Sequence, residues 1–175
     1  MAEPSTPLPT DKALGDDERS TLLGFLDYHR AVLARKAEGI TDEQALLAAC
    51  PPSELTLLGL VRHMTDVERF WFRRSLVAED VPPVYYGVAH PDGDDDGDFH
   101  APAGATVAGA LAAYWDEIDV ANRNIAAAAL DDVPQREPDR GHSLRWIVVH
   151  MIEEYARHCG HADMLRQAID GTTGD

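Results

Sequence analysis

Three side chains that can bind a metal ion fall on one face of a predicted helix near the C-terminus. Glu154 and His158 are four residues apart, and His158 and His161 are three apart, so successive helical turns aim them at one point. His63 is a fourth candidate, because it alone interrupts a row of apolar residues in an earlier predicted helix. A carboxylate and several imidazoles are costly to bury unless they are paired or bind a metal. These four residues therefore predict a divalent metal site.

Nitrogen and carboxylate ligands of this kind suit Zn²⁺, Ni²⁺, Fe²⁺ or Mn²⁺, and the spacing alone does not choose among these ions. Three protein ligands with the remaining positions open to water are typical of a catalytic site rather than a structural one. Two other interpretations stay open from the residues alone. His63 could be a hydrogen-bonded core histidine, and Glu154 could form a surface ion pair with Arg157 or Arg145.

Four segments that could position these residues carry apolar side chains at helical spacing, and no strand-like alternation or internal repeat is visible. Ser53 and Ser143 precede two of the segments as N-caps, while Gly39 and Gly171 follow two of them as stops. The sequence therefore predicts an all-α four-helix bundle, with helices over residues 16–38, 54–77, 106–130 and 144–169.

The longest predicted connection, residues 80–104, contains four prolines and four glycines and therefore no regular element. A loop of this length in a compact domain is usually functional or mobile, so we expect it to act as a lid over the site. The proline-rich residues 1–15 predict a flexible arm, residues 16–171 a single domain, and residues 172–175 a tail.

Composition excludes several classes of function. The formal net charge of −16 argues against a nucleic-acid partner, since such proteins concentrate basic residues on one face. The two cysteines are too few for disulfide bonds to hold together a chain of this size, which favours a reducing compartment. The N-terminus lacks the pattern of a signal peptide, and the apolar runs are too short to cross a membrane. We therefore expect a cytoplasmic protein with no membrane or nucleic-acid partner.

Other motifs give weaker signals. Residues 92–98 match the opening of a calcium-binding loop, but position twelve of that loop would be Ala103 instead of a bidentate glutamate. We interpret this run as a solvated acidic turn. Cys159 is expected to pack, buried and inert, against another helix. The three tryptophans are expected in the bundle core or at its rim; they are Trp71, Trp115 and Trp146.

With His63 in LVRHMTDVERFWF, and the segment HMIEEYARHCGHADMLRQAIDG, the chain resembles the DinB-like superfamily over residues 16–171. The resemblance is to its actinobacterial branch, which is related to mycothiol-dependent transferases and maleylpyruvate isomerase. It implies a four-helix bundle whose metal ion is held by His63 and by the pair Glu154 and His158. His161 either replaces Glu154 or lies outside the ligand set.

The function implied by this resemblance is that of a metal-dependent transferase or isomerase. It would use a low-molecular-weight thiol such as mycothiol, activated as a metal-bound thiolate, and a small electrophile. A homodimer is left open. An alternative is a non-catalytic bundle that binds a metal or small ligand in a stress response, and a third is a structural, dimerising bundle with satisfied core histidines.

Overall fold

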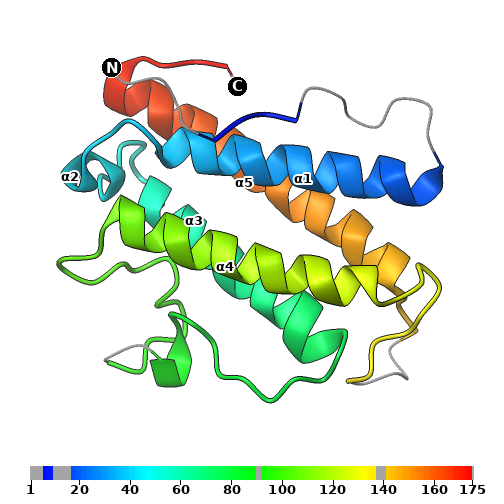
Figure 1. Cartoon of the computed structure of the whole chain (residues 1–175). Helices are drawn as coiled ribbons and strands as arrows, with labels where there is room; N and C mark the ends of the chain where they lie inside the picture. The colour runs from blue at the N-terminus through cyan, green and yellow to red at the C-terminus, as the bar shows by residue number, and fades with distance from the viewer. Residues whose placement is uncertain (1–5, 10–16, 90–91, 137–140, 175) are drawn as a thin grey trace.

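The computed structural model describes residues 6–9, 17–89, 92–136 and 141–174, and these ranges contain helices and no strand. Four long helices confirm the predicted all-α bundle (Figure 1). Most of the expected arm over residues 1–15 lies outside the described residues, and the division into arm, domain and tail stays a prediction. The elements in order are α1 (Glu18–Ala37), α2 (Asp42–Ala45), α3 (Leu57–Glu68), the π-helix η1 (Arg69–Ser75), the 3₁₀-helix η2 (Gly87–Ala89), α4 (Val107–Ala126) and α5 (Leu144–Asp170).

Side-chain caps account for most of the helix boundaries. Ser143 caps α5 as predicted, and Gly171 ends that helix in the left-handed conformation at a φ of 78°. The predicted cap Ser53 is wrong, because α3 begins later, where the hydroxyl of Thr56 accepts from the backbone N–H of Gly59 at 3.0 Å. The short helix α2 was not predicted, although Thr41 forms a capping box with the third residue of that helix.

The second predicted helix changes character along its length instead of continuing as an α-helix to residue 77. From Arg69 to Ser75 it is a π-helix, and the carbonyl of Phe72 in this segment accepts from the side-chain amide of Asn124 at 2.9 Å. The π-helical turn is wider than an α-helical turn, and such segments are frequent at functional sites. Here it carries Phe70 and Trp71, both of which line the cavity beside His63.

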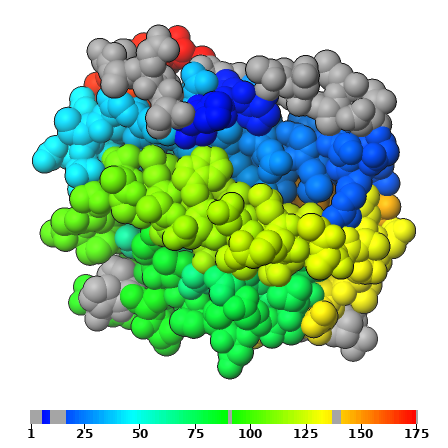
Figure 2. All heavy atoms as spheres, viewed as in Figure 1, coloured from blue at the N-terminus to red at the C-terminus, as the bar shows by residue number. Residues whose placement is uncertain are grey.

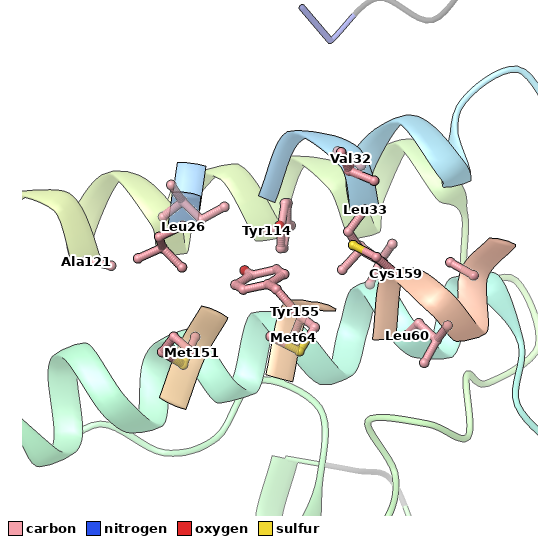
Figure 3. Packing of buried hydrophobic residues seen from close by; sticks show 14 of the residues in the cluster. Leu26, Val32, Leu33, Leu60, Met64, Tyr114, Ala121, Met151, Tyr155 and Cys159 are labelled. Carbon is pink, nitrogen blue, oxygen red and sulfur yellow. The ribbon is translucent and has the colours of Figure 1, made fainter. Parts of the chain in front are cut away.

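The four long helices pack chiefly in two pairs, α1 against α5 and α3 against α4 (Figure 1). In the space-filling view, α1 and α4 form most of the visible face, and the green segment that leads from η1 towards α4 covers its lower part (Figure 2). Tyr114 of α4 and Tyr155 of α5 are fully buried and point towards one another between the helices (Figure 3). Met64 and Met151 fill the core beside them.

A buried ion pair crosses this core. Arg30 of α1 is 1% exposed and donates two hydrogen bonds to Glu68 of α3, at 2.8 and 2.7 Å. The hydroxyl of Tyr155 on α5 donates to the same carboxylate at 2.7 Å. On α4, Asn122 accepts from Arg30 at 2.9 Å, and Tyr114 donates to the Arg30 carbonyl at 3.1 Å. One network therefore joins all four long helices.

We predict that Glu68→Gln and Arg30→Met each lower the free energy of unfolding by about 3–5 kcal/mol. Each substitution removes one charge of the pair and leaves the opposite charge buried without its partner. The double variant should cost less than the sum of the two single variants, since no unpaired charge then remains. Urea denaturation followed by circular dichroism measures all three. Additive losses would mean that the two side chains do not act as a pair.

Candidate metal centre

The structure brings three of the four candidate ligands together. His63 of α3 and Glu154 and His158 of α5 each offer one ligand atom, and these atoms all lie within 4.8 Å of one another. His161 is outside this set, but its Nδ1 lies 3.4 Å from Nδ1 of His158. The spacing of Glu154 and His158 thus places them on one face of α5, as predicted, and His63 faces them from α3.

His63 is held in place by two neighbouring residues of the long connection. Its Nδ1 lies 2.8 Å from a carboxylate oxygen of Asp98, and its ring stacks on Phe99 at a centroid distance of 4.2 Å. A carboxylate at Nδ1 favours the tautomer that carries the proton there, which leaves Nε2 with a free lone pair. His63 therefore offers Nε2 as its ligand atom.

His158 is the most buried of the three candidate ligands, at 7% exposure. Its Nε2 lies 3.6 Å from a carboxylate oxygen of Glu154. Burial, reinforced by His63, His161 and Arg157, lowers the pKa of His158 from 6.5 to about 4. The imidazole is consequently neutral around pH 7, which is the form that binds a metal.

Glu154 forms the ion pair with Arg157 that its position suggested and also faces another candidate ligand. One of its carboxylate oxygens accepts from Arg157 at 3.2 Å, and the other faces His158. Because the side chain of Arg157 is 52% exposed, this ion pair contributes little to stability. The Glu154 side chain itself is only 15% exposed, so the carboxylate stays available on the side of the two imidazoles.

The donor set suits a divalent transition metal. Two imidazole nitrogens and one carboxylate oxygen are ligands that Zn²⁺ and related ions accept, at about 2.0–2.2 Å from the ion. Ligand atoms of a tetrahedral ion are then separated by about 3.4 Å, so the three side chains, whose ligand atoms lie within 4.8 Å of one another, would draw closer together around the ion. Three ligands would leave coordination positions for water or a substrate.

Residues of α3 fasten the long connection against the site. Arg62 donates to the backbone carbonyls of Gly97 and Asp98, at 2.7 and 3.2 Å. Asp66 accepts from the backbone N–H groups of Val84 and Tyr85, at 2.6 and 2.9 Å. The connection predicted to be a lid is therefore held down at two places and forms a wall of the site.

The interpretation of residues 92–98 as a solvated turn is wrong for Asp98. This residue is 7% exposed and contacts His63, whereas its neighbours Asp95 and Asp96 are exposed. Nothing in the sequence distinguishes Asp98 from the other acids of the run. The contact joins residues 35 positions apart, so only the folded structure shows it.

A cavity of about 260 Å³ opens beside His63. Its walls come from α3, from η1 and from the long connection, and they are formed by His63, Asp66, Val67, Phe70, Trp71, Tyr86, Asp95, Asp96, Asp98 and Phe99. A concave space next to a group of potential ligands is where a substrate would bind.

Cys159, Trp71 and Trp146 lie outside the group of three candidate ligands. Cys159 is buried, as predicted, with its thiol 3.6 Å from the carbonyl of His29. Trp71 lies 5.5 Å from Trp146, measured between ring centroids, and Trp146 stacks on His150 at 5.0 Å. Trp146 is 47% exposed, so this aromatic cluster reaches the surface at the rim of the bundle, as expected for Trp146.

Comparison with known proteins gives one match. The sequence model of the mycothiol S-transferase family matches residues 21–171. No curated protein and no solved structure matches the chain. Every helix in the described part of the chain is too short or too polar to cross a bilayer.

We predict that acid destabilises the metal-free protein through His158. Folded His158 stays neutral down to about pH 4, whereas the unfolded residue takes up a proton near pH 6.5, so stability is lost as the pH falls between these values. The loss between pH 7 and pH 5 should be about 2 kcal/mol. Urea denaturation in the presence of a chelator measures it. His158→Gln, which cannot titrate, should lose about 2 kcal/mol less than the parent over this interval.

Proposed function

The chain belongs to the mycothiol S-transferase family, and on this basis we propose that it joins a low-molecular-weight thiol such as mycothiol to an electrophile at a divalent metal ion. His63, Glu154 and His158 would hold the ion. The observation that carries this proposal is the convergence of these three ligand atoms, from two different helices, beside an open cavity.

A divalent ion bound there would stabilise the thiolate form of the thiol, which is the reactive nucleophile. The protein's own residues contribute orientation and access. Asp98 keeps the proton of His63 on Nδ1, and burial keeps His158 neutral, so both imidazoles present a lone pair. The cavity beside His63 offers the electrophile a place next to the thiol.

His161 takes a supporting part in this proposal. It lies 3.4 Å from Nδ1 of His158, on the side away from the contact between Nε2 of His158 and Glu154. An outer partner of this kind orients a ligand imidazole without binding the ion itself. The cytoplasmic location expected from the sequence stays a prediction, and a homodimer is still left open.

We predict that His63→Ala and His158→Ala each abolish tight binding of Zn²⁺ or Ni²⁺ while helical content stays near that of the parent. Glu154→Ala should weaken binding nearly as much, whereas His161→Ala should cost only about 10- to 100-fold, as the loss of an outer partner does. Calorimetric titration of the four purified variants measures these affinities. Parent-like binding by His63→Ala would rule out a site shared between the two helices.

A second prediction concerns Asp98, which contacts the proposed ligand His63 but is not one of the three donors. Asp98→Ala should lower metal affinity by about 10- to 100-fold without changing the stoichiometry, because His63 loses the group that fixes its tautomer and ring orientation. Asp92→Ala, on an exposed residue of the same connection, is the matched control for the loss of one negative charge. Equal effects of both substitutions would show that charge alone, and not the contact with His63, matters.

A further inference from the structure

The cavity beside His63 has a one-sided charge. Four aspartates line it, and the described residues that form its walls include no lysine or arginine. Three arginines near the cavity are engaged with other groups: Arg62 with the backbone of the connection, Arg69 with Glu117, and Arg74 with the hydroxyl of Tyr86. Among the residues that line the cavity, a substrate group with a negative charge would find no lysine or arginine as a partner.

The four aspartates differ in whether their carboxylates are already bound by other groups of the protein. Both carboxylate oxygens of Asp66 accept hydrogen bonds from backbone N–H groups. One oxygen of Asp98 contacts His63, and the other accepts from the backbone N–H of Phe99. Asp95 and Asp96 are exposed and lie in the wall of the cavity. They are therefore the carboxylates that can face a bound molecule.

Charge from the proposed metal ion does not cancel this excess. Glu154, itself a proposed ligand, and Asp98, which contacts the proposed ligand His63, together balance the charge of a divalent ion. The charges of Asp95 and Asp96 remain, and the whole chain is acidic, with a net charge of −16. The field in the cavity thus attracts cations and repels anions.

Aromatic rings supply a second, independent feature of the cavity. Phe70 and Trp71 are consecutive residues of the π-helix η1, and Tyr86 and Phe99 come from the long connection. The faces of such rings attract ammonium groups, most strongly when the group is partly shielded from water. The Phe99 ring stacks on His63, and the Arg74 guanidinium lies 5.8 Å from the centroid of the Phe70 ring, so Trp71 and Tyr86 are the rings that we expect an ammonium group to contact.

We propose that this cavity selects electrophiles that carry a cationic group, a protonated amine or a quaternary ammonium, with Asp95 and Asp96 as the residues that determine this specificity. The inference rests on the proposed function, because it concerns the second substrate of the thiol transfer. A neutral polyhydroxylated group could also donate hydrogen bonds to carboxylates, but it would lack the attraction to the aromatic faces and the dependence on salt.

The test uses three N-substituted iodoacetamides that differ only in their distal group, which is trimethylammonium, hydroxyl or carboxylate. In each reaction the thiolate sulfur bonds to the methylene carbon while the carbon–iodine bond breaks. Iodide leaves with the electron pair, and the thiol proton goes to the buffer. Turnover with mycothiol and Zn²⁺ is measured for each probe against the reaction without protein.

We expect kcat/KM to be highest for the cationic probe and lowest for the anionic one. Asp95→Asn and Asp96→Asn should each reduce the advantage of the cationic probe by up to about fivefold, as expected for an exposed charge pair. The neutral probe should lose less turnover than the cationic probe in both variants. Asp92→Asn, an equal charge change on the same connection, should leave the order of the probes as it is. Added salt should diminish the preference.

A binding measurement separates this inference from the proposed function. The unreactive acetamide of the trimethylammonium probe should bind the metal-free protein and alter tryptophan fluorescence, because Trp71 lines the cavity. Binding without any turnover would support the cation site while the transferase proposal fails. Turnover of all three probes at equal rates, or unchanged selectivity in Asp95→Asn and Asp96→Asn, would overturn the cation site and leave the transferase proposal standing.

Discussion

The buried ion pair between Arg30 and Glu68 is the contact that fixes how the helices are placed relative to one another. It receives a hydrogen bond from Tyr155 of α5, so the register of α5 against α3 is set at this point. Tyr155 directly follows Glu154, and Glu68 lies five positions after His63 on the continuous helical segment of α3. A slip of one turn would break this network and would also separate Glu154 and His158 from His63. The geometry of the candidate site is therefore determined in the core.

A second constraint acts from the opposite side of His63. Three residues of α3 contact the long connection: Arg62 and Asp66 bind its backbone, and His63 contacts the carboxylate of Asp98. The helix thus anchors the connection, and the connection in turn orients a residue of the helix. Such mutual support explains how a segment rich in proline and glycine, with little regular structure, can form a defined wall. A segment that was only tethered at its ends would not hold an imidazole in one orientation.

The sequence predicted the parts of this structure that depend on local periodicity. Glu154 and His158 are four residues apart on one long amphipathic helix, and His63 interrupts an apolar row on another. Each of these two patterns can be recognised within a single helix. Asp98 could not be found in this way, because its contact with His63 depends on how a long connection folds back. The start of α3 was misplaced for a related reason: serine is in general at least as good an N-cap as threonine, yet in the structure Thr56 caps the helix. The π-helix at Arg69–Ser75 has no sequence signal that we can identify.

The candidate site is an unfavourable place for a histidine in the absence of a bound ion. His158 is buried next to His63 and His161, and these neighbours together with burial lower its pKa to about 4. A protein selected only for stability would place an apolar side chain there, as it does at Met151 on the same face of α5. Polar groups that violate the apolar pattern of a core are expected where function requires them. The proposed metal ion would bind the three donor side chains, whose polar groups find only some of their partners within the protein. On this view the cluster costs stability in the empty protein, and the ordered wall around His63 keeps it ready for binding.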